Sequence, residues 1–216
     1  MRRRTGLILA LDRVDTSRAL ALAESCREHV DAVKVGLPLT LAAGTEIIGK
    51  LSRVRDVVCD FKIADIPPIA ADIARVAFQS GARGVICHGF AGEDTVRAVV
   101  EAAEGEVFVV TEMSHSGGQE FTAPVADRIA HLAVRAGAHG IVAPATRPER
   151  VRALRAIVGS LQILAPGAGA QGGRAGDAIR AGADFAIVGR AITDAPDPAR
   201  AAAAVAAEIA EAGEKH

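Results

Sequence analysis

Short apolar runs rich in Val, Ile and Leu recur along the chain at near-regular spacing. Runs that are apolar at successive positions are typical of strands buried on both faces of a parallel sheet. Eight such strands are predicted, at residues 7–12, 32–36, 57–62, 84–88, 107–112, 140–143, 162–165 and 185–189.

The segments between these runs carry apolar residues at helical spacing. The clearest helices are predicted at 16–29, 70–79, 125–135 and 148–157. Gly81, Gly137 and Gly182 follow such segments, as glycine does at helix C-termini. With 216 residues shared among eight units, the alternation predicts an α/β protein with a (β/α)8 TIM barrel fold. An open doubly wound sheet is the alternative architecture.

Composition and charge narrow the classes of partner. Half of the 216 residues are hydrophobic, which supports a single barrel domain over residues 1–216, with 1–5 expected to be a flexible N-terminus. A net charge of −1 predicts no general attraction to nucleic acid or to anionic membranes. The apolar run at 7–11 is stopped by Asp12 and is too short for a signal peptide or a membrane span. A cytoplasmic location is therefore expected.

Three cysteines, at positions 26, 59 and 87, form no Cys-x-x-Cys pair. This spacing indicates neither a disulfide framework nor a zinc site. They are expected to be small buried apolar residues.

Polar residues gather where the predicted strands end, and in a barrel the carboxyl ends of the strands form the active site. Lysine is scarce, with four Lys against 21 Arg, yet two of the four lie at strand ends. Lysine can release a proton when its pKa is tuned, whereas arginine cannot, so this bias suggests proton chemistry. The strand-end residues are Asp12, Lys34, Asp60, Lys62, His88, Glu112, Ser114, Pro166, Gly189 and Arg190.

The stretch Asp-Phe-Lys-Ile-Ala-Asp at 60–65 holds three charges in six positions. If Asp60 and Lys62 belong to one strand, the strand period of two turns both side chains to the same face. Asp65 follows closely, before Ile66 and two prolines turn the chain away.

A glycine-rich segment, 166–173, follows the seventh predicted strand. Gly167 to Gly172 formally matches the dinucleotide motif G-x-G-x-x-G, but it falls late in the chain, and Asp184 opens the next strand where the motif's acidic residue should close one. Glycines here also suit a mobile lid over 166–176 that closes on a phosphate. The phosphate site of many barrels is built after strands seven and eight, so Gly189 and Arg190 complete the prediction of a phosphorylated substrate.

In order along nearly the whole chain, these motifs resemble orotidine 5'-phosphate decarboxylase in its short archaeal form. The resemblance rests on Asp12, 33–36, 60–67, 88–90, 112–115, 166–173 and 188–190. It implies a carboxy-lyase that converts orotidine 5'-phosphate to UMP and CO2 in de novo pyrimidine biosynthesis. It also implies that the reaction needs no metal and no organic cofactor, and that the enzyme is a homodimer.

The resemblance also implies roles for single residues. Lys62 would stabilise and protonate the carbanion left by CO2, Asp60 would lie near the departing carboxylate, and Lys34 and Asp65 would extend an alternating chain of charges. Asp65 would act in the partner subunit's site across a two-fold interface. Substrate contacts are implied for Asp12 and Lys34 at the ribose, Ser114 at the pyrimidine, Gln171, Gly189 and Arg190 at the phosphate, and for Ile66 and Pro166.

Two departures from the family pattern concern peripheral contacts. Ile69 stands where a Thr often supports the ribose region, and Thr193 stands where a Tyr often adds to the phosphate site. Two alternatives are weighed. A metal-dependent keto-sugar-phosphate decarboxylase or aldolase of the same superfamily carries an acidic residue where this chain has Lys34. A catalytically silent nucleotide-binding barrel would be expected to lose Asp60, Lys62 or Asp65.

Overall fold

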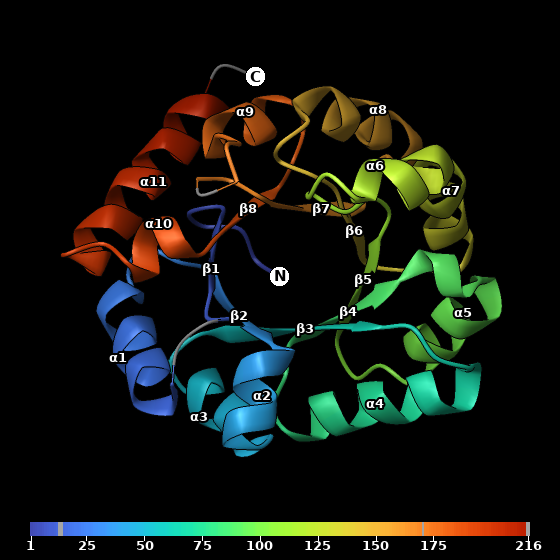
Figure 1. The fold of residues 1–216 in the computed structure, drawn as a ribbon, viewed down its shortest axis with the longest axis horizontal. Helices are drawn as coiled ribbons and strands as arrows, with labels where there is room; N and C mark the ends of the chain where they lie inside the picture. Colours follow the sequence, from blue (N-terminus) through green and yellow to red (C-terminus); the bar gives the residue numbers. More distant parts are fainter. Residues whose placement is uncertain (13–14, 170, 215–216) are drawn as a thin grey trace.

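The computed structural model describes residues 1–12, 15–169 and 171–214. Eight parallel strands pair in sequence order, and β8 pairs with β1 to close a barrel, which Figure 1 shows end-on inside its ring of helices. The TIM barrel prediction is therefore confirmed, and the open sheet is excluded. The strands are β1 Leu7–Ala10, β2 Ala32–Gly36, β3 Asp56–Ile63, β4 Gly84–His88, β5 Glu106–Val110, β6 Gly140–Val142, β7 Gln162–Pro166 and β8 Phe185–Val188.

Every predicted strand corresponds to one of these, with ends that differ by at most two residues. β1 ends at Ala10 and β5 at Val110, so Asp12 and Glu112 lie in the loops just beyond their strands. This matters for the site, because a residue past the strand end is free of the sheet's alternation and can turn toward the barrel mouth.

Helices cover the outside of the barrel in the order expected. The four clearest predictions are confirmed as α1, α4, α7 and α8, and α4 begins three residues before the predicted start, because Pro67 suits the first helical turn. The helices are α1 Thr16–Cys26, α2 Leu37–Ala43, α3 Glu46–Ser52, α4 Pro67–Gln79, α5 Glu93–Glu101, α6 Gly118–Phe121, α7 Ala126–Arg135, α8 Pro148–Val158, α9 Ala175–Arg180, α10 Arg190–Thr193 and α11 Pro198–Gly213, with 3-10 turns η1 Gly89–Ala91 and η2 Ala123–Val125.

The barrel interior is a separate apolar cluster beneath the mouth. Phe108 and Phe185 are its largest members and are almost fully buried. Gly140 on the neighbouring strand makes room for Phe108, since a Cβ there would lie 2.7 Å from Phe108 Cδ1. A filled interior of this kind supports the site from below and leaves its chemistry to the upper rim.

The N-terminal residue takes part in this interior packing. Met1 is 8% exposed, and its amino group donates to the side-chain oxygens of Glu106 and Gln162. Figure 1 accordingly shows the N-terminus within the ring of strands. The Met1 side chain belongs to the apolar cluster of the barrel interior, and the flexible N-terminus expected at 1–5 stays a prediction.

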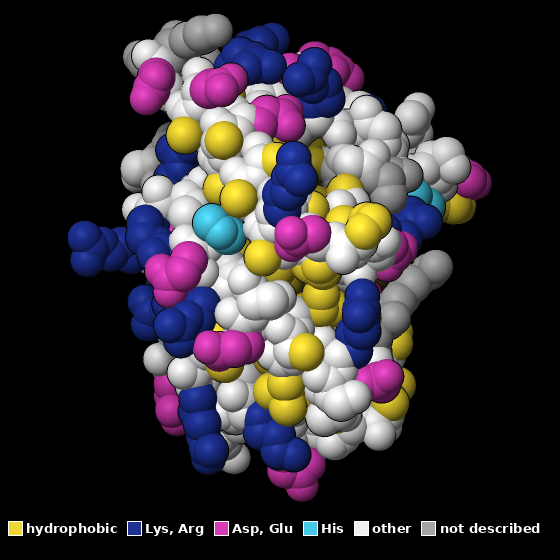
Figure 2. All heavy atoms as spheres, turned by 90° about the vertical axis from the view of Figure 1, so that its left-hand side faces the viewer, with side chains coloured by type: hydrophobic (Ala, Val, Ile, Leu, Met, Phe, Trp, Pro, Cys, Tyr) yellow, Lys and Arg dark blue, Asp and Glu magenta, His cyan; other side chains and the backbone are white. Residues whose placement is uncertain are grey.

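The outer surface carries charges of both signs. On the face that bears α1, α10 and α11, Figure 2 shows Lys and Arg side chains interspersed with Asp and Glu. Among the helices of the described ranges, none combines the length and the apolar character needed to cross a bilayer. The cytoplasmic location stays a prediction. The three cysteines are buried and unpaired, as expected.

Candidate active site

A cavity of about 410 Å³ opens at the carboxyl end of the barrel strands. Charged and polar side chains gather on its wall from β1, β2, β3, β5, β7 and β8 or from the loops that follow them. Most of the predicted site residues line it: Asp12, Lys34, Asp60, Lys62, Ser114, Pro166, Gln171, Gly189 and Arg190.

One side of this cavity holds a chain of alternating charges. Lys34 Nζ lies 2.6 Å from Asp12 Oδ1 and 2.9 Å from Asp60 Oδ2. Lys62 Nζ donates to both Asp60 oxygens, at 2.8 and 2.9 Å. The side chains of Lys34 and Asp60 are 5% and 11% exposed, whereas that of Lys62 is 37% exposed. The inner pair is therefore fixed, and Lys62 is the member that presents its cation to the cavity.

The charges stabilise one another despite their burial. Burial by itself would lower the pKa of Lys34, but the carboxylates of Asp60 and Asp12 outweigh it and hold that pKa above its usual value. Burial would likewise raise the pKa of Asp60, and the two lysines outweigh it, so that the pKa is lowered. Both groups thus stay ionised at neutral pH, and the site is charged before any substrate enters.

The backbone at Lys62 is unusual. Lys62 has φ 47°, the only positive φ at a non-glycine residue in the described part of the chain. The pairing of β3 with β4 also shifts register between Cys59 and Ile63. Positive φ costs a non-glycine residue of order 1–3 kcal/mol and persists only where surrounding contacts impose it. At the end of the side chain, the double hydrogen bond to Asp60 holds the Lys62 ammonium group at the cavity.

Asp65 and Ile66 do not join the cavity of their own chain. Asp65 Oδ1 accepts a hydrogen bond from the Ile66 backbone N–H at 2.7 Å, and the Asp65 carbonyl accepts one from Thr95 Oγ1 at 2.9 Å. Both residues are exposed and border a separate shallow depression with Ala91 and Asp94. Of the predicted charge chain, the structure brings together Lys34, Asp60 and Lys62, and it places Asp65 outside the cavity of its own chain. Asp12, which was predicted as a ribose contact, joins the chain through Lys34.

The opposite side of the cavity joins two loops. Ser114 Oγ donates to Gln171 Oε1 at 2.8 Å, which links the loop after β5 to the glycine-rich loop after β7. Within the latter, Gly169 N–H donates to the Gly173 carbonyl at 2.7 Å. Ala170, also part of the predicted 166–176 lid, lies outside the described residues. Arg190 begins α10 directly after β8 and also lines the cavity.

Comparison with protein families adds the deciding observation. The family model described as orotidine 5'-phosphate decarboxylase / HUMPS family matches residues 5–205. The chain belongs to this family. The match spans all eight strands and every residue of the cavity wall named above, so the resemblance drawn from the motifs is confirmed.

Individual relatives agree with the family. The orotidine 5'-phosphate decarboxylase of Methanosarcina mazei is 53% identical over 213 residues, which is 97% of each chain. A crystal structure of the enzyme from Methanocaldococcus jannaschii, complexed with the inhibitor BMP, has a TM-score of 0.90 at 41% identity and covers 94% of this chain and 98% of its own. The structure from Pyrococcus horikoshii has a TM-score of 0.88 at 45% identity, with coverage of 94% and 99%.

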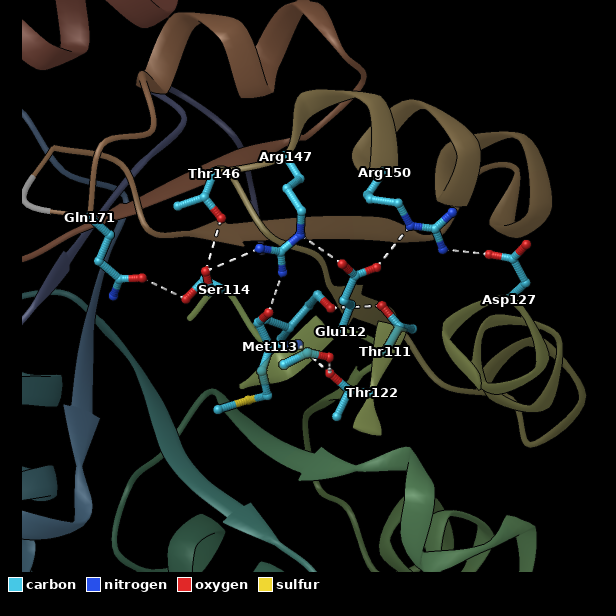
Figure 3. Close-up of polar contacts among 12 residues, drawn as sticks. Thr111, Glu112, Met113, Ser114, Thr122, Asp127, Thr146, Arg147, Arg150 and Gln171 are labelled. Carbon is cyan, nitrogen blue, oxygen red and sulfur yellow. Dashed lines mark hydrogen bonds and ion pairs between the residues drawn. The ribbon is translucent and has the colours of Figure 1, made fainter. Parts of the chain in front are cut away.

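This member of the orotidine 5'-phosphate decarboxylase family also holds a buried ion cluster that the motifs did not predict. Glu112, fully buried, lies 2.8 Å from Arg147 Nε and 2.9 Å from Arg150 Nε, as Figure 3 shows. The sequence places Glu112 at a strand end and in the motif 112–115 but assigns it no role. Arg147 lies at the end of the loop after β6 and Arg150 lies in the first turn of α8. In a chain with 21 arginines nothing local distinguishes them.

His88 is the remaining strand-end residue of the sequence analysis. Burial lowers its pKa to about 4, Lys62 adds to this effect and Asp60 opposes it. Its ring lies 4.5 Å from that of Phe90, and its buried Nδ1 has no hydrogen-bond partner within the described residues. His88 is thus neutral at pH 7. Over the same residues, no group of three or more His, Cys, Asp or Glu is arranged to hold a metal ion.

Proposed function

We infer that this chain decarboxylates orotidine 5'-phosphate to UMP and CO2 within the barrel-mouth cavity. The observation that carries the proposal is the alternating series Asp12, Lys34, Asp60 and Lys62, preformed at the rim in a member of this family. The enzyme is a carboxy-lyase of UMP biosynthesis.

The chemistry asks for what this series can provide. Loss of CO2 leaves a carbanion on the pyrimidine ring, and this charge must be stabilised electrostatically and then protonated. Lys62 meets both needs, as a cation at the cavity surface and a proton donor. At 4 Å and an effective dielectric of 20, opposite unit charges attract by roughly 4 kcal/mol, so the network holds Lys62 in place before reaction.

Asp60 has two roles in this proposal. It fixes Lys62 and Lys34 through its two oxygens, and it lies beside the place of the substrate carboxylate. Repulsion between the two carboxylates favours departure of CO2, since CO2 leaves as a neutral molecule and the negative charge moves from the carboxylate to the ring carbon, where Lys62 stabilises and protonates it. Asp12 and Lys34 hold the ribose hydroxyls.

The far side of the cavity receives the rest of the nucleotide. Arg190, Gln171 and the Gly189 backbone bind the phosphate, and Ser114 reads the pyrimidine. Pro166 forms the wall between them. The Ser114–Gln171 hydrogen bond joins the loop after β5 to the loop after β7. The two loops are therefore expected to close together, the first over the base and the second over the phosphate.

The active unit is a homodimer that shares its sites. Ile66, Ile69 and Phe90 are 62%, 44% and 59% exposed and follow the adjacent strands β3 and β4, beside Asp65. Exposed apolar side chains at neighbouring loops are typical of an interface. A two-fold contact at this place carries Asp65 and Ile66 of each subunit into the other's cavity, where Asp65 extends the charge series. Ile69 then serves packing rather than the ribose.

The substrate assignment is tested against the alternative of a keto-sugar-phosphate decarboxylase. Purified protein supplied with orotidine 5'-phosphate is expected to lower its ultraviolet absorbance as UMP accumulates on chromatography. A phosphorylated 3-keto sugar acid, supplied with magnesium, is expected to stay unchanged, because Lys34 occupies the space between the two carboxylates that a metal ion would need. Turnover of the sugar acid and not of the nucleotide would reverse the assignment.

Arg190→Ala tests the phosphate site. Removal of one charge-assisted phosphate contact is expected to lower kcat/KM by about 10- to 100-fold, or roughly 1.5–3 kcal/mol. Arg53→Ala is the control, because Arg53 is exposed and follows α3 just before β3 begins, away from the carboxyl ends of the strands where the cavity opens. Steady-state kinetics of both variants measure the effect. A change in kcat/KM below twofold in Arg190→Ala would mean that the phosphate binds elsewhere.

A further inference from the structure

Glu112 and its two arginines form a buried ion cluster. A fully buried carboxylate lowers the stability of the fold unless it is paired, so this cluster is expected to serve a purpose. Its two oxygens divide between two arginines, Arg147 on Oε1 and Arg150 on Oε2. The two arginines continue in different directions. Arg150 reaches Asp127 on α7 at 2.7 Å, away from the cavity, whereas Arg147 turns toward the cavity loops, as the close-up in Figure 3 makes visible.

Arg147 holds the backbone of the loop that carries Ser114. Its Nη2 donates to the Met113 carbonyl at 2.5 Å, and its Nη1 lies 3.5 Å from the Ser114 carbonyl. The neighbouring Thr146 Oγ1 donates to the same Ser114 carbonyl at 3.0 Å. The loop after β6 therefore grips two successive carbonyls of the loop after β5.

This grip continues into the glycine-rich loop. The Ser114 carbonyl is bound by Thr146 and Arg147, and the Ser114 hydroxyl donates to Gln171 Oε1. A single line of contacts thus runs from the buried Glu112 through Arg147 and the Ser114 backbone to Gln171, and it joins the loops after β5, β6 and β7. A guanidinium is suited to the central position, since its planar fork can bind a carboxylate and a carbonyl at once.

We propose that Glu112 and Arg147 are positioning residues. They set the position and orientation of the Ser114 side chain at the pyrimidine and, through the Ser114 hydroxyl, the position of the Gln171 side chain. The inference rests on the proposed role of Ser114 in substrate binding. Glu112 orients Arg147, and Arg147 fixes the loop. When a substrate-binding group is displaced by about 1 Å, the reaction rate can fall by about 100-fold. Loss of the contacts that hold this loop is therefore expected to be visible in the kinetics.

The test compares two matched substitutions, Arg147→Lys and Arg150→Lys. Each keeps a cation beside Glu112, but a lysine at 147 cannot span both Glu112 and the Met113 carbonyl. Arg147→Lys is expected to lower kcat/KM for orotidine 5'-phosphate by about 10- to 100-fold. Arg150→Lys is expected to stay within about threefold, even if both variants melt at a lower temperature. Equal kinetic effects in the two variants would overturn the proposal.

A second arm asks whether Arg147 acts through Ser114. In a Ser114→Ala background, Arg147→Lys is expected to change kcat/KM by less than about twofold, because the side chain it positions is already absent. Effects that multiply would overturn the proposal. A Ser114→Ala variant with wild-type kinetics would remove both the proposed role of Ser114 and the positioning that depends on it, while the decarboxylase assignment, which rests on Lys62, would stand.

Thr146→Val covers the case in which Arg147→Lys does not fold. This substitution conserves shape and removes only the second hydrogen bond to the Ser114 carbonyl. It is expected to lower kcat/KM by about 3- to 10-fold in the wild-type background and to have no further effect in Ser114→Ala. An unchanged kcat/KM in Thr146→Val with wild-type Ser114 would contradict the proposal.

Discussion

Lys62→Ala protein is expected to lose turnover by at least about 10⁴-fold while it still binds the nucleotide. The change removes both the cation that faces the developing carbanion and the proton donor, and it leaves the phosphate and base contacts on the opposite wall. Single-turnover assays measure the first effect, and titration with UMP measures the second. UMP affinity is expected to stay within about tenfold.

Lys50→Ala is the control for this prediction, since Lys50 is an exposed lysine on α3 and remote from the cavity. It is expected to behave as wild type. Turnover close to wild type in Lys62→Ala would show that Lys62 is not the proton donor. Loss of UMP binding in a folded variant would show that Lys62 serves nucleotide recognition instead.

A mixture of Lys62→Ala and Asp65→Ala proteins, each inactive alone, is expected to regain roughly a quarter of wild-type activity once subunits exchange. Random mixing makes half of the dimers hybrid. In a hybrid, one site has lost both residues and the other has Lys62 from one subunit and Asp65 from its partner. The exposed position of Asp65, outside its own cavity, is the structural reason for this expectation.

A second mixture gives the control. Lys62→Ala and Asp60→Ala alter the same side of one site, where the two residues are joined at 2.8 Å, so every site of a hybrid stays damaged and no activity should return. Native mass spectrometry reports exchange in both mixtures. If exchange is complete and the Asp65→Ala mixture stays inactive, Asp65 works within its own chain or has no part in the reaction.

The barrel could be predicted from the sequence because strands that are buried on both faces of a parallel sheet appear in the sequence as continuous apolar runs. Such runs mark a strand locally, and the closed order follows from the β-then-α alternation. The same reasoning placed Lys34, Asp60 and Lys62 together, since carboxyl ends of parallel strands meet at one rim. Asp12 joined them from just beyond its strand.

The remaining features depend on contacts between distant parts of the chain. The positive φ of Lys62 accompanies a register shift in the pairing of β3 with β4, and this pairing joins segments that no local sequence pattern relates. Arg147 resembles any surface arginine until the fold brings it to Glu112, 35 positions earlier in the chain. The buried place of the Met1 side chain likewise depends on the closed barrel, which no local pattern records.

The most direct test of the proposed reaction is to measure the turnover of orotidine 5'-phosphate by exhaustively chelated protein. We expect the paired lysines and aspartates of the chain to perform the decarboxylation without a metal ion. The expected result is one UMP and one CO2 for each orotidine 5'-phosphate consumed, at the same rate before and after EDTA treatment. Activity that disappears with EDTA and returns with magnesium, or a substrate that is never converted, would contradict it.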